Sequence, residues 1–211
     1  MEGSKHLRAA VTAELVEKKS RFIAYLTPVT SEEEALAFIS SIKKKHYDAR
    51  HNCSAYIVGN VARSSDDGEP SHTAGRPMMD ALVAAGLSDV CVVVTRYFGG
   101  ILLGTGGLVR AYKGAVNEAL LNADIYELVK MAKLGICLSY PDYGKVSRMA
   151  GENGEMKDCG YGLCAIRNLA YGENVSFNLY CQPENTEKII ETITNLTLGQ
   201  ATIDDLGFEE L

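Results

Sequence analysis

A chain of 211 residues that is 46% hydrophobic and 23% charged has the composition of a soluble globular protein, which excludes wholesale disorder. Its longest apolar runs, such as residues 90–94, are too short to cross a bilayer, and its first ten residues contain no apolar secretory segment. We therefore expect a cytoplasmic protein, without a membrane partner, that forms one large domain or two ordinary ones.

The net charge of −6 is distributed unevenly along the chain. Residues 1–130 contain fifteen acidic and fifteen basic side chains, whereas residues 131–211 contain twelve acidic and six basic ones. An acidic segment repels a polyanion at long range, so nonspecific coating of nucleic acid is not expected. A local cluster of cations in the neutral part could still bind phosphates.

The six cysteines are spread along the chain without a CxxC pair. Because no secretory signal is present, we expect reduced thiols and no disulfide framework. Three of them fall in apolar or alternating stretches and are predicted to be core residues: Cys91, Cys137 and Cys181.

The N-terminal part begins with two predicted strands, residues 9–16 and 21–28, separated by the turn-like segment EKKS. Alternation along the second strand is clear at Phe22, Ala24 and Leu26. The two segments therefore predict an antiparallel hairpin.

A helix is predicted next, because Ser31 and Glu34 have the spacing of a capping box. Its apolar side chains have helical spacing: Ala35, Phe38, Ile39 and Ile42. The lysines at 43–45 are interpreted as solvated charge at the helix C-terminus, where cations are favoured.

Two further strands are predicted at residues 53–59 and 89–96. Between them lie a polar segment, residues 64–77, and a short helix near 78–85. Another helix is predicted over 106–123 from its apolar stripe: Leu108, Tyr112, Ala115, Val116, Ala119 and Leu120.

After about residue 131 the pattern starts again. Strands are predicted at 133–140, near 156–161, at 175–181 and at 201–206, and helices at 142–151 and around residues 189–196. The order βαββαβ predicts a ferredoxin-like split βαβ sandwich. We therefore expect an α+β protein with two domains, residues 1–131 and residues 132–211.

The segment RYFGGILLGTGGLVRAY, residues 96–112, leaves a strand, passes five glycines and enters a helix. It lacks both common nucleotide motifs, since Thr105 stands where a P-loop needs lysine and Val109 stands where GxGxxG needs its third glycine. Glycine still allows positive φ and close backbone approach, and a helix start could face an anion. Arg110 is predicted near the first turn of that helix and shares one face with Lys113 and Asn117.

The polar segment concentrates three carboxylates, Asp66, Asp67 and Glu69, in four positions. Three interpretations stay open: a lid over a ligand, a structural network with Arg96, Arg110 and Arg76, or a disordered loop.

Four stretches together resemble the successive signatures of the YigZ/IMPACT family: KKSRFIA (18–24), HNCSAY (51–56), SDDGEPSHTAGRP (65–77) and RYFGGILLGTGGLVRAY (96–112). The resemblance implies an N-terminal α+β domain similar to domain IV of elongation factor G and a ferredoxin-like domain similar to its domain V. Eukaryotic members regulate translation by competing for the activator of a starvation-activated kinase. They carry an extra RWD domain, so that partner is not carried over to this chain.

The positions that match the family's motifs are Lys19, Arg21, His51, Asp66, Asp67, Gly68, Glu69, Pro70, Arg96, Gly99, Gly100, Gly104, Gly106, Gly107 and Arg110. His72 departs from a position that the family usually fills with glycine. An imidazole there is expected to restrict the backbone or to add a side chain to the site.

Our first hypothesis is a noncatalytic translation regulator that binds ribosomal RNA, the ribosome or a ribosome-bound protein. Its anion-binding surface would consist of Lys19, Arg21, Arg96, Gly99, Gly100, Gly104, Gly106, Gly107, Arg110 and Lys113. The adjoining polar loop would contribute Asp66, Asp67, Gly68, Glu69, Pro70 and His72. No cofactor or metal is expected in this hypothesis.

The alternative is a magnesium-dependent enzyme that acts on a phosphorylated small molecule or a nucleotide. Asp66, Asp67 and Glu69 would hold Mg²⁺, and the glycine segment with Arg96 would bind phosphate. No nucleophile elbow or HExxH motif is present, so no catalytic residue is assigned. A third hypothesis, a metal or redox site at His51, Cys53 and His72, has a weaker signal, because structural zinc normally takes four ligands in paired spacings.

Overall fold

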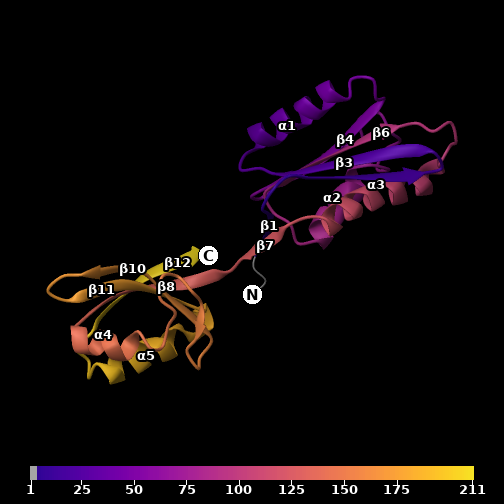
Figure 1. Ribbon diagram of the computed structural model, residues 1–211. Helices are drawn as coiled ribbons and strands as arrows, with labels where there is room; N and C mark the ends of the chain where they lie inside the picture. The colour runs from indigo at the N-terminus through magenta and orange to yellow at the C-terminus, as the bar shows by residue number, and fades with distance from the viewer. Residues whose placement is uncertain (1–3) are drawn as a thin grey trace. The chain divides into compact units, whose positions relative to one another are not determined.

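The computed structural model describes residues 4–211, which form two compact units that divide between Leu128 and Val129 (Figure 1). Both units combine an antiparallel sheet with helices, so the protein is a two-domain α+β protein. The observed division lies close to the boundary near residue 131 that the sequence predicts.

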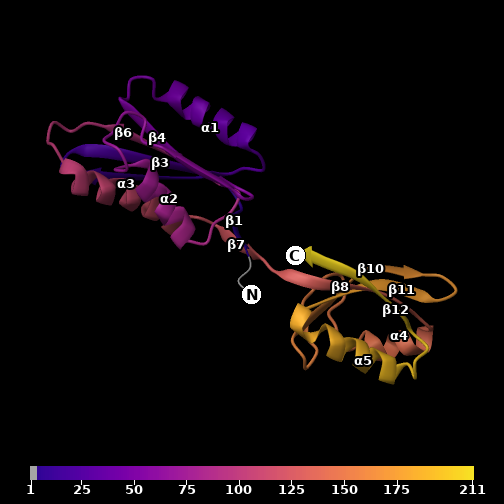
Figure 2. The same ribbon diagram turned by 180° about the vertical axis from the view of Figure 1, so that it is seen from behind.

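The first unit is built on a five-stranded antiparallel sheet with the strand order β2-β3-β6-β4-β5. Its strands are β2 (Val11–Glu17), β3 (Ser20–Pro28), β4 (His51–Val58), β5 (Val61–Ser65) and β6 (Val90–Tyr97). Helix α1 (Glu32–Lys45) covers one face, while α2 (Gly75–Ala84) and α3 (Gly104–Leu121) cover the other (Figures 1 and 2).

Strand β3 shows why both faces of this sheet are buried. Phe22, Ala24 and Leu26 pack in the core beneath α2 and α3, whereas Ile23 and Tyr25 pack in the core beneath α1. Successive side chains of a strand point to opposite faces, so one strand supplies both cores. This explains the long buried runs of β3 and β6.

The start of α1 differs in one bond from the predicted capping box. Ser31 is the N-cap, and its Oγ accepts a hydrogen bond from the Glu34 N–H at 3.2 Å. The Glu34 carboxylate does not return to Ser31 but accepts from the N–H of Thr30 at 2.7 Å and from its hydroxyl at 2.9 Å. The Glu34 side chain therefore bonds to the residue before the N-cap, whereas in a capping box it bonds to the N-cap residue itself.

Three strands of the first unit were not predicted. Strand β5 is exposed along most of its length. Strand β1 (Ser4–Leu7) pairs with β7 (Ile125–Leu128), which lies at the other end of the unit's sequence. Helix α3 also begins at Gly104, so Arg110 lies in its second turn. Arg110 was predicted near the first turn, and because the helix dipole acts mainly on the terminal turn, it affects this cation only weakly.

The second unit has the sheet order β12-β8-β11-β10-β9, with all neighbours antiparallel. Apart from the two-residue β9, its order is the split βαβ arrangement of ferredoxin-like domains, and both helices cover one face. Its elements are β8 (Lys130–Leu138), α4 (Tyr140–Val146), β9 (Lys157–Asp158), β10 (Leu163–Tyr171), β11 (Val175–Cys181), the 3-10 helix η1 (Pro183–Asn185), α5 (Thr186–Leu196) and β12 (Thr202–Glu210).

The second long strand of this unit was predicted near 156–161, and this prediction is wrong, because that strand is β10. The register of β10 against β11 shifts between Arg167 and Ala170, and Asn168 has a φ of +57°. Such an irregularity interrupts the period-two pattern by which a strand is recognised.

All six cysteines are free thiols in this structure. Cys91 and Cys181 are core residues as predicted, but Cys137 is only half-buried. Along β8 its side chain alternates with the buried Ile136 and Leu138, so it lies on the face of the sheet opposite the helices.

The Sγ atoms of Cys159 and Cys164 lie 3.0 Å apart, so we expect peroxide to link them. Peroxide converts one thiol to a sulfenic acid with release of water, and the second thiol displaces another water to form the disulfide. Cys159 is half-buried and Cys164 is buried, and burial raises the pKa of the Cys164 thiol. Cys159 is therefore expected to react with peroxide first. Intact mass should fall by two hydrogens and return with dithiothreitol.

Two serine variants make this prediction specific. Cys164→Ser should abolish the mass change, whereas Cys137→Ser should retain it. A cross-link that persists in Cys164→Ser would contradict the assignment.

Candidate functional site

Arg96 at the end of β6 forms the centre of a buried polar network. Its Nη1 lies 2.6 Å from Oε1 of Glu69, and the two side chains are 8% and 3% exposed. The Tyr112 hydroxyl of α3 donates to the same oxygen at 2.7 Å. The network thus ties the polar loop, here residues 66–74, to both the sheet and a helix.

Asp66 joins the polar loop to the start of α2. One carboxylate oxygen accepts from the backbone N–H groups of Ala74 and Gly75, at 2.9 and 2.8 Å, and the other accepts from His72 N–H at 2.8 Å. Burial alone would raise the pKa of Asp66, but these backbone hydrogen bonds outweigh it and hold the pKa below its usual value. The carboxylate therefore caps a helix whose own N-cap, Ala74, offers no side-chain acceptor.

Asp67 ties the polar loop to α1 and β4. It accepts from Lys43 at 2.6 Å and from the backbone N–H of Asn52 at 2.7 Å. Lys43 lies in the last turn of α1 as predicted, and the folded loop adds an ion pair with Asp67 that was not predicted. His72 has a φ of +63°, so it holds a left-handed conformation where relatives were expected to have glycine.

Gly68 and Pro70 complete the turns of this loop. Gly68 has a φ of +85° and lies against the His51 ring, and the Pro70 carbonyl accepts from both the N–H and the hydroxyl of Thr73. With Asp66, Asp67 and Glu69 all bonded within the chain, the loop braces the unit.

The residues of the magnesium and redox hypotheses face donors and acceptors of the chain itself. His51 Nδ1 bonds the Asp67 carbonyl at 2.9 Å, and the Cys53 thiol donates to the Asp66 carbonyl at 3.0 Å. Burial raises the pKa of Cys53 to about 12, so its thiol is protonated at neutral pH. Within residues 4–211 no group of three or more His, Cys, Asp or Glu side chains is arranged to hold a metal ion.

The glycine segment after β6 is shaped by close approach. A Cβ on Gly99 would overlap the backbone carbonyl of Lys19, and the Gly99 N–H donates to Ser20 Oγ at 3.1 Å. Gly100 and Gly104 have positive φ, and Gly107 leaves only a narrow gap to Leu103. Gly106 lies inside α3 with its Cβ direction facing Arg110. Gly99 thus allows the turn between β2 and β3 to pack against this segment.

The predicted cations fall into two groups. Arg96 is buried against Glu69, and Arg21 forms two hydrogen bonds with Glu14, at 2.8 and 2.9 Å. In contrast, no ion-pair or hydrogen-bond partner among residues 4–211 is found for the side chains of Lys19, Arg110 and Lys113, which are exposed.

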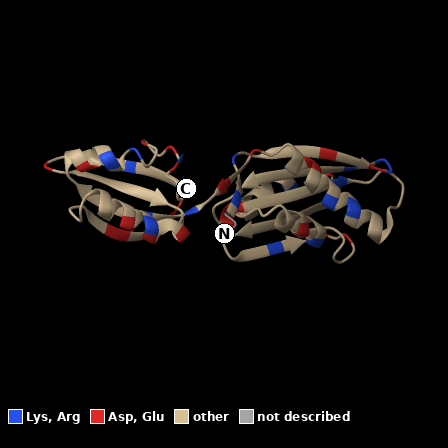
Figure 3. Ribbon diagram, turned by 90° about the horizontal axis from the view of Figure 1, so that it is seen from below, with Lys and Arg blue, Asp and Glu red and all other residues tan. Residues whose placement is uncertain are grey.

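Lys18 adds a fourth exposed cation that was not predicted. A cavity of about 180 Å³ is lined by Lys18 and Arg110, together with Glu17, Leu15, Leu103, Gly107 and Ala111. We call Lys18, Lys19, Arg110 and Lys113 the open cationic surface; lysine and arginine positions are blue in Figure 3. Lys18 and Lys19 both have positive φ, which places them in the tight turn between β2 and β3.

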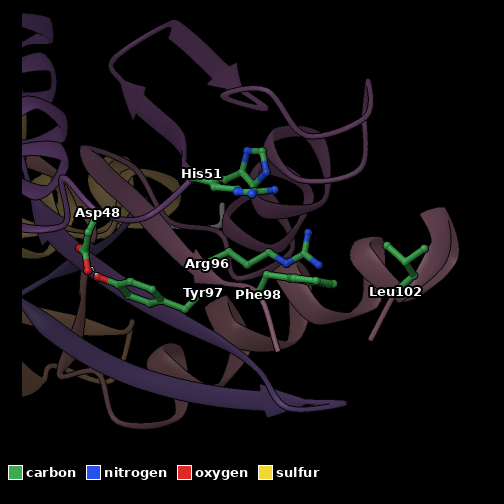
Figure 4. A pocket seen from close by; sticks show the side chains of 7 residues that line it. Asp48, His51, Arg96, Tyr97, Phe98 and Leu102 are labelled. Atoms are coloured by element: carbon green, nitrogen blue, oxygen red, sulfur yellow. Dashed lines mark hydrogen bonds between the residues drawn. The ribbon is translucent and has the colours of Figure 1, made fainter. Parts of the chain in front are cut away.

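A larger cavity of about 460 Å³ lies where Arg96 and His51 meet (Figure 4). Its lining consists of Asp48, Arg50, His51, Arg96, Tyr97, Phe98 and Leu102. Only Arg96 among them was predicted as an anion-binding residue. Tyr97, Phe98 and Leu102 belong to the segment 96–112, but none of the three was predicted to be a functional residue.

The fold and the site define a two-domain α+β protein whose N-terminal unit has a glycine-shaped cationic surface. The Impact N-terminal domain family matches residues 18–120. IMPACT family member YvyE of Bacillus subtilis (strain 168) is 42% identical over 195 residues, covering 91% of this chain and 86% of that protein. The chain belongs to the IMPACT family.

Two further comparisons cover nearly the whole chain. An IMPACT family member from the pol 5′ region of Thermus thermophilus is 46% identical, covering 89% of this chain and 98% of that protein. A solved structure described as a hypothetical protein has a TM-score of 0.59 at 32% identity and covers 98% of each chain. Among the described residues, no helix is both long enough and apolar enough to span a membrane.

Proposed function

We propose that this protein is a noncatalytic, translation-associated regulator that binds ribosomal RNA through the open cationic surface. Membership of the IMPACT family supports a role in translation, since the eukaryotic members regulate that process. The family resemblance also implies domains similar to domains IV and V of elongation factor G, and domains of that kind would fit a role in translation.

The observation that carries the proposal is that four cations stay exposed without an acidic partner in the described chain. Lys18 and Arg110 line the cavity beside the start of α3, whose N-cap Leu103 makes no side-chain hydrogen bond and whose first turn contains no acidic residue. The N-terminal end of a helix is electropositive, so it adds to the attraction for an anion. Arg96 and Arg21 are not part of this surface, because Glu69 and Glu14 already neutralise them.

The double variant Arg110→Ala, Lys113→Ala is expected to weaken binding to ribosomes and to ribosomal RNA. Each phosphate contact contributes about 0.7–0.9 to the slope of log binding constant against log salt concentration. The slope should therefore fall by roughly 1.4–1.8 in the double variant. The measurement is cosedimentation with ribosomes, and fluorescence anisotropy with ribosomal RNA fragments, over a series of salt concentrations.

Arg21→Ala is the matched control, because it removes one positive charge from the same unit but from a side chain that Glu14 already holds. Its slope should equal that of the wild type. Absence of cosedimentation at low salt would refute the proposal. Binding to ribosomes but not to RNA, with an unchanged slope in the double variant, would instead identify a ribosome-bound protein as the partner.

A further inference from the structure

The cavity beside Arg96 has the size of a small-ligand site. Its volume of about 460 Å³ lies within the range of roughly 300–1,000 Å³ that is typical of such sites. Asp48, Arg50 and His51 come from the start of β4 and the loop before it, and the other lining residues follow from the end of β6 to the start of α3. The cavity therefore lies where separate segments of the sheet and the glycine segment converge.

Arg96 is nine-tenths buried at this cavity, yet its hydrogen-bonding capacity is only partly used. Nη1 donates to Glu69, while Nε is buried and has no partner among residues 4–211. A buried donor without an acceptor is costly, so the site is incomplete as it stands. Figure 4 shows the guanidinium between the His51 side and the Phe98 ring.

Arg50 supplies positive charge to the cavity, and His51 supplies a ring nitrogen. The Arg50 guanidinium is exposed, and the described chain provides it with no ion-pair partner. His51 uses Nδ1 for the Asp67 carbonyl, which leaves Nε2 available to a ligand. The acidic lining residue, Asp48, accepts from the Tyr97 hydroxyl at 2.9 Å, and Figure 4 shows this pair away from Arg96.

Two apolar side chains of the cavity lining are open to solvent. Phe98 is 51% exposed and Leu102 is 83% exposed, although both are large apolar side chains. The Arg96 guanidinium carbon lies 5.7 Å from the centre of this half-exposed Phe98 ring. A cationic group beside an exposed aromatic ring is the combination that binds the phosphate and base of a single-stranded nucleic acid.

We infer that this cavity is a subsite for one nucleotide. The charge of Arg50 attracts its phosphate, which accepts a hydrogen bond from the unpaired Nε of Arg96, and its base lies against the Phe98 ring. When the ligand is RNA, one unpaired nucleotide occupies the subsite. This version of the inference rests on the RNA binding proposed above. The glycine segment connects the two sites, because Leu102 lines this cavity and Leu103 lines the smaller one beside Lys18 and Arg110. A free nucleoside monophosphate offers the same chemistry.

Equilibrium binding to the full chain tests the inference with four probes: adenosine monophosphate, inorganic phosphate, a labelled single-stranded RNA octamer and its duplex. The wild type should bind the single strand more tightly than the duplex. Phe98→Ala should weaken binding of the single strand about five- to 150-fold, the range that one stacked base corresponds to. Arg50→Ala should also lower the salt slope by about 0.7.

Leu121→Ala and Lys44→Ala are the matched controls, since they remove an exposed apolar side chain and an exposed cation elsewhere on the same unit. Both should bind as the wild type does. Because Phe98 and Arg50 are themselves exposed, far-UV circular dichroism should show that their variants remain folded.

The outcomes separate this inference from the proposed function. Adenosine monophosphate binding that depends on Phe98, without RNA binding, supports the subsite and refutes the RNA-binding function. Loss of RNA binding only in the Arg110→Ala, Lys113→Ala variant supports the function and refutes the subsite. Equal binding of inorganic phosphate and adenosine monophosphate, unaffected by Phe98→Ala, also refutes a nucleotide subsite.

Discussion

Glu69→Ala is expected to lower the free energy of unfolding of the first unit by about 3–5 kcal/mol. The variant leaves the Arg96 guanidinium buried without its counter-charge, and the Tyr112 hydroxyl also loses its acceptor. Because both side chains of the ion pair are almost fully buried, water cannot replace the missing carboxylate without local opening. The loss should therefore be much larger than for an ion pair on the surface.

Glu14→Ala provides the comparison, since Glu14 pairs with Arg21 through two hydrogen bonds, of 2.8 and 2.9 Å, on the surface. It should cost only about 0–1 kcal/mol. Urea unfolding followed by far-UV circular dichroism measures both variants, and hydrogen exchange should locate the increased opening of Glu69→Ala in β4 and β6.

A second variant separates the loss of attraction from the cost of an unpaired charge. Replacing both partners, Glu69→Ala with Arg96→Met, should recover part of the stability, because no buried charge is then left alone. Equal stability of Glu69→Ala and Glu14→Ala would contradict the buried network.

Gly99→Ala is expected to destabilise the first unit by about 1–3 kcal/mol or more, because overpacking a rigid contact forces the backbone to move. The added methyl group would overlap the carbonyl of Lys19, and neither backbone segment is a flexible side-chain end that can turn away. The shift would also strain the hydrogen bond from the Gly99 N–H to the buried Ser20. Thermal and urea unfolding measure the change.

Gly106→Ala is the matched control, with the opposite sign expected. Gly106 is the third residue of α3, and a Cβ there would meet only Arg110 Nη1, at 3.6 Å. Alanine is favoured over glycine in helical backbone, by about 1 kcal/mol in a helix interior and by less in the first turn, so the variant should be as stable as the wild type or gain up to about 1 kcal/mol. A Gly99→Ala protein as stable as the wild type would show that Lys19 and Gly99 are not in close contact.

Local patterns predicted most of the regular structure, because burial is periodic along each element. Alternation at Phe22, Ala24 and Leu26 identified β3, and Ser31 identified the start of α1. The predictions were wrong where that periodicity is interrupted: β5 is largely exposed, and β10 carries an irregular register at Arg167.

The family motifs directed attention to the polar loop and the glycine segment, but they did not predict the state of each side chain. The sequence placed Glu69, Arg96 and Arg110 in that region without deciding which arginine the carboxylate would neutralise. The fold brings Glu69 to Arg96, 27 positions along the chain, and leaves Arg110 exposed on α3. The cavity at Phe98 depends on the same convergence.

The amino-acid sequence by itself determined the two α+β units, the family and the glycine-rich segment, since these depend on residue type and on spacing over a few positions. Only the tertiary structure decided that Asp66, Asp67 and Glu69 brace the unit, and that Lys18, Lys19, Arg110 and Lys113 stay open. The physical reason is that charge pairing acts through space. Whether a cation is neutralised depends on which distant segment folds against it, and local periodicity does not contain that information.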